Sequence, residues 1–487
     1  MRADGLTADS CRQSGIGHQP HSSRRLAWHD GQKPRVRQEN IKYETGFQNV
    51  SSSMVLFDPM SHEYSFVTFQ PALIKMEKYS LVVIGGGPAG LFCALRAAGN
   101  GRKILIVEKK PLPGRKLLLS GSGQCNITHE EEIGSFLSHY GDNGRFLKPA
   151  LMNFQNRDLI SFFTERGLPL MTEPGGKVFP LSRKASGILD ILVKECTAAH
   201  VEIRCGDPVL EVSVRDEGFS IRTGQRTCRA DQLVMATGGI TYPATGSTGD
   251  GYVFARSLGH SVTEVSPALA AVTIQDYPFS DLAGISFADV IISLTRAGQK
   301  IRQRTGDLLL THSGLSGPGI LDFSRFIRPG DTLRISFLPG IDYQKVKETL
   351  LNRISAAGNA QVRTVLTAYD LPERFVNKLL TLAGIELDLT GAHLSRKDRS
   401  ALIELLTGCP FVVGRLGGIH EAMVTRGGVS LAEINPKTME SRLVPRLFFV
   451  GEVMDIDGDT GGYNLQAAFS TAALAAQRIV ERTSESA

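Results

Sequence analysis

Three glycines at a fixed spacing are the clearest chemical signal in the sequence. Gly85, Gly87 and Gly90 follow the apolar run LVVI (81–84) and open the helix-like stretch AGLFCALRAAG. After a strand and before a helix, the first glycine permits a tight turn, the second lets the backbone approach a pyrophosphate, and the third allows close helix–strand packing. Free N–H groups at the helix start favour the phosphate charge. The pattern predicts a dinucleotide-binding turn.

An acidic residue lies at the second position that such a site needs. Glu108 ends the apolar run KILIVE (103–108), 18 residues after Gly90. A carboxylate at the end of this strand can accept hydrogen bonds from both ribose hydroxyls of an adenosine, and it disfavours a 2′-phosphate. The sequence therefore predicts a ribose site beside the glycine turn.

Two further glycine-rich segments favour FAD as the dinucleotide. In GRKLLLSGSGQCN (114–126), Arg115 and Lys116 precede a flexible loop rich in donors, which can wrap a pyrophosphate and reach a flavin edge. A solvated charge pair explains Arg115 and Lys116 almost equally well. In ATGGITYPATGSTGDGY (236–252), a strand ends at Thr237 and Gly238, and the small residues that follow indicate backbone close to a ligand.

A third segment, VGEVMDIDGDTGGYNLQAAFSTAALAA (450–476), places Gly461 and Gly462 before a helix rich in alanine. The helix start, near Asn464 and Leu465, can stabilise the negative charge that develops at the N1/C2 edge of a reduced flavin. A nicotinamide has no comparable need. The small residues of this helix also fit a well-packed core helix, and the two interpretations are compatible.

Composition indicates an ordinary globular protein. Of 487 residues, 42% are apolar and 21% charged, and 54 basic against 49 acidic side chains give a formal charge of +5. No dense Lys/Arg block indicates nucleic-acid binding. Seven cysteines without a CxxC pair argue against a disulfide framework or a zinc site, and no run approaches the roughly 20 apolar residues of a membrane span. We expect a cytoplasmic protein with a small-molecule substrate and no metal, nucleic-acid partner or membrane.

The first 75 residues differ from the rest because they are polar and lack a sustained period. Acidic residues such as Asp4, Asp9 and Glu39 argue against a transit peptide. We expect residues 1–75 to be a disordered or misassigned extension, with Met76 as the natural start.

From Tyr79 to about residue 260, strand-like and helix-like stretches alternate, which indicates an α/β domain with a mostly parallel sheet. Between about 266 and 413 the alternation stops. This segment contains β-rich stretches, followed by amphipathic helices near 343–356, 372–384 and 396–407. Ser395 can cap the last of these helices. We therefore expect an FAD-binding domain in two parts, 76–265 and 414–487, with an inserted domain at 266–413 and a final helix near 464–481.

Four segments of the chain together resemble the BaiN/aminoacetone-oxidase-like family of FAD-binding flavoproteins. The matching motifs are GRKLLLSGSGQCN, ATGGITYPATGSTGDGY, THSGLSGP (311–318), and INPKTMES followed by GE and GGYN. The resemblance covers about residues 76–482. It implies a Rossmann-like FAD domain of the glutathione-reductase type, interrupted by an insert with a β-barrel-like part and a helical part.

The resemblance also implies roles for single residues. Glu108 would hold the adenosine ribose, Arg115 and Lys116 the pyrophosphate side, Gly121 and Asn126 the flavin neighbourhood, Asp455 and Asn464 the ribityl chain and ring, and the Val209 backbone the adenine. Residues that adjoin these motifs complete the expected cofactor contacts: Pro88, Ala89, Lys109, Gly451 and Glu452. Gln124 and Arg446 depart from the arginine and glycine of many relatives, which concerns only local contacts near the flavin.

No catalytic residue can be assigned from the sequence, but four candidates for a proton donor lie in or beside the motifs: His312, Cys125, Tyr242 and His420. Cys125 fits a buried small side chain equally well. For His312, a hydrogen bond to the backbone that joins the insert to the FAD domain is favoured over a catalytic role.

Three functions remain open at this point. The chain lacks a second glycine-turn unit for a nicotinamide, so the electron donor must dock transiently or be the substrate. We favour an oxidoreductase in which NAD(P)H reduces the flavin and the flavin passes hydride to an activated C=C bond, because the insert offers surface to enclose a sizeable apolar substrate. The alternatives are a flavin amine oxidase that uses oxygen, and an FAD-containing redox sensor or scaffold.

Overall fold

The computed structural model describes residues 52–57, 64–69, 76–216, 218–338, 343–367 and 369–485. The chain divides into two units, Met1–Ile74 and Lys75–Ala487. In the first unit, strands β1 (Ser52–Phe57) and β2 (Tyr64–Phe69) pair antiparallel, a feature that the sequence analysis did not foresee. The remainder of the extension predicted over residues 1–75 lies outside the described residues.

A seven-stranded sheet forms the centre of the second unit, in the order β8-β4-β3-β11-β10-β9 with β20 also paired to β11. Its parallel strands are β3 (Glu77–Ile84), β4 (Ile104–Glu108), β8 (Glu202–Cys205), β11 (Thr227–Met235) and β20 (Leu447–Phe449). The antiparallel strands β9 (Val209–Arg215) and β10 (Gly218–Thr223) extend one edge. The alternating pattern from Tyr79 onward thus does form the expected mostly parallel sheet, and the Rossmann-like fold class is confirmed.

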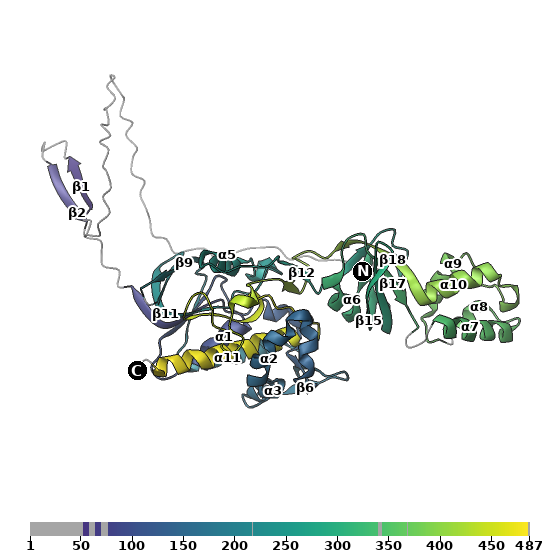
Figure 1. The fold of residues 1–487 in the computed structure, drawn as a ribbon, viewed down its shortest axis with the longest axis horizontal. Helices are drawn as coiled ribbons and strands as arrows, with labels where there is room; N and C mark the ends of the chain where they lie inside the picture. Colours follow the sequence, from purple (N-terminus) through teal and green to yellow (C-terminus); the bar gives the residue numbers. More distant parts are fainter. Residues whose placement is uncertain are drawn as a thin grey trace, which may run out of the picture. The chain divides into compact units, whose positions relative to one another are not determined.

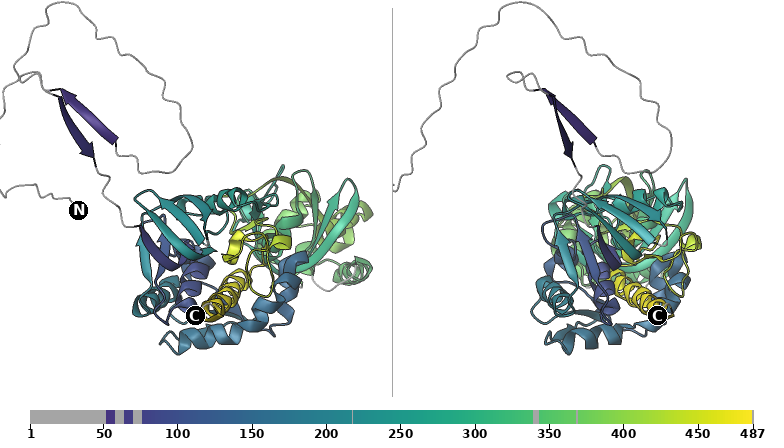
Figure 2. Two further views of the ribbon diagram at one scale, coloured as in Figure 1. Left: turned by 60° about the vertical axis from the view of Figure 1, so that its left-hand side comes forward. Right: turned by 90° about the vertical axis from the view of Figure 1, so that its left-hand side faces the viewer.

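The helix that follows the glycine turn packs on the last helix of the chain. Figures 1 and 2 show α1 (Pro88–Ala97) beside α11 (Tyr463–Glu485), and Phe92 meets Phe469 with ring centroids 5.2 Å apart. The small residues of α11 are buried, as a close helix packing requires. Other helices around the sheet are α2 (Gly144–Asn153), α3 (Asn156–Thr164), α4 (Ala185–Ala198) and α5 (Asp250–Ser257).

A small antiparallel sheet accompanies this domain, in the order β5-β7-β6. Its strands are β5 (Thr128–His129), β6 (Leu170–Thr172) and β7 (Lys177–Pro180). It joins the segment after the GRKLLLSGSGQCN motif to a hairpin before α4.

The insert contains a closed barrel and a helical part. The barrel strands are, in spatial order, β13 (Val272–Ile274), β16 (Gly314–Ser316), β15 (Gln299–Leu310), β14 (Ser286–Arg296), β17 (Thr332–Ser336) and β18 (Cys409–Leu416). The short helix α6 (Pro318–Phe323) packs on this barrel. Between β17 and β18 come α7 (Tyr343–Ala357), α8 (Val362–Thr367), α9 (Glu373–Leu382) and α10 (Arg396–Gly408), at the far end in Figure 1.

Three of these four helices were predicted from the sequence, and α8, which is only six residues long, was not. Ser395 caps α10 as expected, because its Oγ accepts a hydrogen bond from the Asp398 N–H at 3.1 Å. The barrel ends at Leu416, a few residues beyond the expected boundary at 413. Phe279, Phe287 and Phe375 help to build an insert core separate from that of the FAD domain.

Two chain segments connect the insert to the FAD domain. They pair as strands β12 (Ser266–Ala268) and β19 (Val424–Arg426), which lie outside the barrel. Leu269 and Val424 bury a small apolar cluster of their own at this connection. The start of the insert predicted at residue 266 therefore falls on a connecting strand and not on the barrel.

Within the described part of the chain, no helix is both long and apolar enough to span a membrane. The same residues hold no cluster of His, Cys, Asp or Glu that could bind a metal ion. Six described cysteines are free thiols, most of them buried.

Candidate functional site

A cavity of about 840 Å³ runs through the FAD domain, from Glu108 to the start of α11. We call it the long cavity. Most of the residues that the sequence analysis assigned to the cofactor line it: Gly85, Gly87, Pro88, Ala89, Glu108, Arg115, Lys116, Gly121, Asn126, Thr237, Gly238, Gly451, Glu452, Gly462, Asn464 and Leu465. Segments far apart in the sequence therefore meet at one site.

The three glycines of the first motif have different roles. Gly85 has φ +111°, and a Cβ there would lie 2.4 Å from the Ala236 carbonyl oxygen. A Cβ on Gly90 would lie 2.0 Å from the Gly85 carbonyl oxygen, so Gly90 packs behind the turn and does not line the cavity. Nothing lies within 4 Å of a Cβ on Gly87, whose backbone borders open space. These three environments match the turn, packing and ligand-approach roles of the motif.

Glu108 is held in place by two backbone donors. Its Oε2 accepts a hydrogen bond from the Gly86 N–H and its Oε1 one from the Lys110 N–H, both at 2.8 Å. Each carboxylate oxygen can still accept a second hydrogen bond. The fixed carboxylate is therefore suited to the two hydroxyls of a ribose.

Lys109 and Val209 lie in a smaller side pocket and do not line the long cavity. This pocket shares Gly85, Glu108, Thr237 and Gly246 with the long cavity. The Lys109 ammonium lies 2.6 Å from the Asp250 carboxylate, which neutralises its charge. Lys109 thus joins the end of β4 to the start of α5, and Val209 lines the same side pocket as Glu108.

Lys116 differs from the role that the resemblance implied. Its Nζ lies 2.8 Å from both carboxylate oxygens of Glu452 and 2.8 Å from Thr241 Oγ1. The Lys116 ammonium is therefore already paired with the Glu452 carboxylate in the cavity wall. Arg115 is exposed and lines the cavity, and it makes no ion pair with any residue that the structure describes. Arg115 is consequently a cation that remains available to a pyrophosphate.

The loop after Arg115 has a specific backbone shape. Gly121, Ser122 and Gly123 all have positive φ, which is uncommon for a serine and marks a loop that its surroundings fix. Asn126 ends the loop and connects it to α11. With its amide nitrogen donating to the Thr128 carbonyl at 2.9 Å, its oxygen accepts from the Gly462 N–H at 3.3 Å.

Asn464 shapes the other loop at this end of the cavity. Its Oδ1 accepts from the Gly458 N–H at 2.8 Å, and its Nδ2 donates to the carbonyls of Gly458 and Asp459. Asp455 is not among the cavity-lining residues, and its carbonyl accepts a hydrogen bond from Asn143. The expected contact of the Asp455 side chain with the ribityl chain and ring thus has no counterpart in the cavity wall.

Among the four proton-donor candidates, Tyr242 is the one that lines the long cavity. It is half-buried, and its backbone has φ +54°, held by a 2.8 Å hydrogen bond from its N–H to the Ile419 carbonyl. Cys125 is fully buried, and burial raises the pKa of its thiol to about 11. His312 and His420 are exposed and do not line the cavity.

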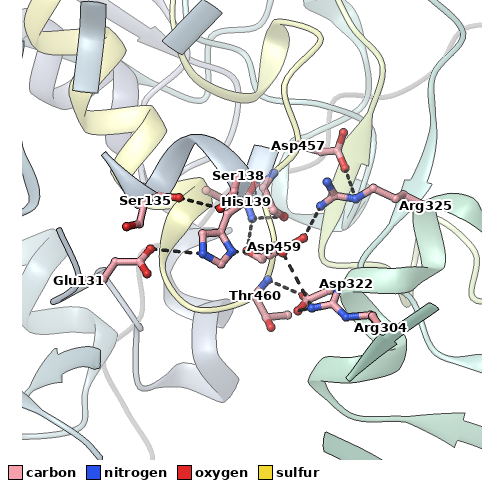
Figure 3. Close-up of polar contacts among 12 residues, drawn as sticks. Glu131, Ser135, Ser138, His139, Arg304, Asp322, Arg325, Asp457, Asp459 and Thr460 are labelled. Atoms are coloured by element: carbon pink, nitrogen blue, oxygen red, sulfur yellow. Dashed lines mark hydrogen bonds and ion pairs between the residues drawn. The ribbon is translucent and has the colours of Figure 1, made fainter. Parts of the chain in front are cut away.

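A set of ionisable residues near the start of α11, which we call the charge network, was not predicted from the sequence. It consists of Glu131, His139, Arg304, Asp322, Arg325, Asp457 and Asp459 (Figure 3). Asp459 lines the long cavity, and its carboxylate lies 2.9 Å from the Arg325 guanidinium and 3.2 Å from the His139 Nδ1. The GDTGG segment was recognised as a motif, but the LDFSR segment that supplies Asp322 and Arg325 has no local pattern to reveal its partner.

Burial shifts two carboxyl groups of the charge network. Burial, reinforced by the nearby charge of Asp459, raises the pKa of Asp322 to about 6. Burial also raises the pKa of Asp457, although the Arg325 guanidinium opposes this shift. Two buried carboxyl groups with raised pKa values therefore lie beside the site.

The long cavity fits FAD. Its wall contains the Glu108 carboxylate, which can bind a ribose, the open backbone of Gly87, and the N-terminus of the long helix α11. A dinucleotide needs these three features in that order, and the positive end of α11 suits the electron-rich edge of a flavin. Glu108, Gly87, Arg115, Asn126 and the start of α11 would hold it.

Comparison with known proteins identifies the family of this chain. The family model described as "HI0933-like protein Rossmann domain" matches residues 79–478. The chain is similar to the "Ribosomal RNA dihydrouridine synthase" of Escherichia coli strain K12, with 36% identity over 83% of this chain and 99% of that protein. The protein of the same name from Haemophilus influenzae is 33% identical over 82% of this chain and 98% of its own length. The "3-dehydro-bile acid delta(4,6)-reductase" of Clostridium scindens is 31% identical over 82% and 98%.

Proposed function

Because this chain belongs to the HI0933-like Rossmann-domain family of FAD-dependent oxidoreductases, we propose that it reduces a C=C bond conjugated to a carbonyl, with a uracil base of ribosomal RNA as substrate and NAD(P)H as the electron donor. The observation that carries this proposal is the 36% identity over 99% of a relative named for dihydrouridine synthesis. The match includes the insert as well as the FAD domain.

The names of the three relatives describe one kind of chemistry. Dihydrouridine is a uridine whose C5=C6 bond is saturated, and a delta(4,6)-reductase removes ring double bonds. In uracil, C5=C6 is conjugated to the C4 carbonyl, which makes C6 electrophilic. Bound flavin supplies hydride at N5, and the neighbouring carbon must receive a proton. The reaction therefore needs a bound flavin, an unstacked base and one acid.

The chain's own residues can meet these requirements. Arg115, Glu108 and the start of α11 hold the cofactor in the proposal, and Tyr242 delivers the proton, because it is the proton-donor candidate in the cavity wall. A base within folded RNA must leave its stack to reach such a cavity. The proposal departs from the sequence-based expectation of a small-molecule substrate and no nucleic acid, which rested on the absence of a dense basic block. A cytoplasmic location is also proposed.

An anaerobic experiment separates this function from its alternatives. Purified holoprotein is mixed with NADH and then NADPH, and the flavin absorbance is followed in a stopped-flow instrument. The proposal expects rapid bleaching by one of them, and reoxidation on adding ribosomal RNA that lacks the modification. Bleaching without reoxidation by RNA, but with reoxidation by a 3-oxo-4,6-diene steroid, would replace RNA with a small enone. No bleaching by either nucleotide would overturn the reductase, and oxygen uptake with amines would favour an oxidase.

A further inference from the structure

The inserted barrel touches the loop that leads into α11. Residues 457–460 form this loop, which we call the flavin loop because it precedes the helix start at the flavin end of the long cavity. We propose that Asp322 and Arg325 of the insert are positioning residues that hold the flavin loop and thereby set the affinity and reduction potential of the bound FAD. The inference rests on FAD binding in the proposed function, and it is independent of the substrate.

Two separate contacts from the insert reach the flavin loop. Asp322, in α6, accepts a hydrogen bond from the Thr460 N–H through its Oδ1 at 2.6 Å. Arg325, in the adjoining 3₁₀ turn Ser324–Phe326, binds Asp457 at 3.2 Å and Asp459 at 2.9 Å. Figure 3 shows both contacts converging on the loop from the barrel side. The backbone and both acidic side chains of the loop are thus fixed from one domain.

The contacts are poorly accessible to water. The side chains of Arg325 and Asp322 are each 7% exposed, and that of Asp457 is 10% exposed. Ion pairs removed from water in this way cost much desolvation energy, and removing one partner leaves a buried charge. An exposed ion pair, by contrast, contributes little to stability.

The flavin loop depends on such external contacts. Gly461 and Gly462, which follow it, have φ values of +121° and +96°, and glycines in this conformation give the backbone little stiffness of its own. On the side away from the barrel, His139 binds Asp459 at 3.2 Å and stacks on Tyr463 with ring centroids 3.9 Å apart. Asp459 is therefore held between the FAD domain and the insert.

A second pair in the barrel provides a matched control. Asp331 is also a buried aspartate bound to an arginine, with Arg296 at 2.8 Å, and its side chain is 3% exposed. It does not line the long cavity and has no contact with the flavin loop. Loss of Asp331 should destabilise the barrel in a comparable way while leaving the flavin site unchanged.

The test compares full-length holoprotein carrying Asp322→Ala, Asp322→Asn or Asp331→Ala. FAD affinity is measured by flavin fluorescence, the midpoint potential by reductive titration with a reference dye, and folding by circular dichroism. Asp322→Ala should weaken FAD binding roughly tenfold to a hundredfold, the range expected when a buried hydrogen bond to a charged group is lost, and should shift the potential and the flavin absorption bands. Asp322→Asn keeps an acceptor for the Thr460 N–H and should lose less.

Asp331→Ala should lower the melting temperature but retain the wild-type FAD affinity and potential. Equal effects of Asp322→Ala and Asp331→Ala on both quantities would overturn the inference, as would an Asp322→Ala protein with a wild-type flavin. If Asp322→Ala does not fold, Asp322→Asn measured against Asp331→Asn decides in the same way. These measurements need no substrate. Failure of the holoprotein to reduce RNA would therefore overturn the proposed function without affecting this inference, which the FAD affinity and the potential decide.

Discussion

Lys116 and Glu452 are joined across the wall of the long cavity, with the ammonium nitrogen 2.8 Å from both carboxylate oxygens. Lys116 belongs to the GRKLLLSGSGQCN motif, and Glu452 to the VGE segment more than 300 residues later. Glu452 also accepts a hydrogen bond from the Thr425 N–H at 2.9 Å, in the strand that returns from the insert. Three parts of the cavity wall thus depend on one carboxylate.

Replacing Glu452 should therefore damage the scaffold and the cofactor site together. Glu452→Ala leaves the Lys116 ammonium and the Thr425 N–H without their acceptor, and we expect a loss of about 1–3 kcal/mol of unfolding free energy. Urea denaturation of the apoprotein measures this loss. Lys116→Met, which removes the charge but keeps the volume, should destabilise less. Unchanged stability of Glu452→Ala would contradict the central place of this carboxylate.

Alanine substitutions at two glycines of the same motif should have different effects, one on FAD binding and one on folding. Gly87→Ala introduces a Cβ into open space, so the protein should fold normally but bind FAD at least tenfold more weakly, because the methyl group occupies the approach of the pyrophosphate. Gly90→Ala forces a Cβ to within 2.0 Å of the Gly85 carbonyl oxygen and should destabilise the apoprotein itself. Thermal unfolding without FAD and fluorescence titration with FAD separate the two effects. A Gly87→Ala protein with full affinity would argue against a pyrophosphate at this turn.

Removal of the Tyr242 hydroxyl should affect one half-reaction only. We expect Tyr242→Phe to keep the rate of flavin reduction by the nucleotide, and to reoxidise with the unsaturated substrate about 100-fold more slowly, the usual contribution of a positioned acid. Stopped-flow absorbance resolves the two steps. His312→Gln, at an exposed position outside the cavity, serves as the control. Equal reoxidation rates for wild type and Tyr242→Phe would remove Tyr242 from the proton-transfer step.

The buried Asp322 should leave a signature in the pH dependence of stability. Its pKa is raised from 3.8 to about 6, by burial first and then by the charge of Asp459, while Arg304 and the Thr460 N–H oppose the shift and Tyr463 lies close enough to sense it. A raised carboxyl pKa means that the folded state holds the proton more tightly, so this contribution to stability is full below pH 3.8 and is lost as pH rises through about 6.

The stability of wild type relative to Asp322→Asn should therefore fall between about pH 4 and pH 6 and stay level above that range. Denaturant titrations at a series of pH values measure the difference, in which ionisable groups that do not interact with Asp322 cancel. A difference that rises over the same interval would show that the carboxyl pKa is lowered and not raised.

The sequence was sufficient for the features that depend on local chemistry. The glycine turn, the acid at Glu108 and the strands around them follow from spacing and periodicity, because a strand, a tight turn and a helix must occur in that order at such a site. Ser395 was recognisable as a cap for the same reason, since its partner Asp398 lies three residues away.

Contacts between distant segments were not recognisable. Lys116 was assigned to phosphate because no local signal shows that Glu452 neutralises it, and Asp322 was passed over because Thr460 lies 138 residues further along the chain. His312 and His420 were candidates because they lie in or beside motifs, but both are exposed and neither lines the cavity. Helix α8 is too short for its apolar residues to establish a period.

A single-turnover experiment tests the central claim most directly. The holoprotein is reduced by light under argon, mixed with ribosomal RNA that lacks dihydrouridine, and quenched at intervals for nucleoside mass spectrometry. The account predicts that flavin reoxidation and dihydrouridine appear together, in equal amounts and at one rate. Flavin that stays reduced in the presence of this RNA, with no dihydrouridine formed, would contradict it.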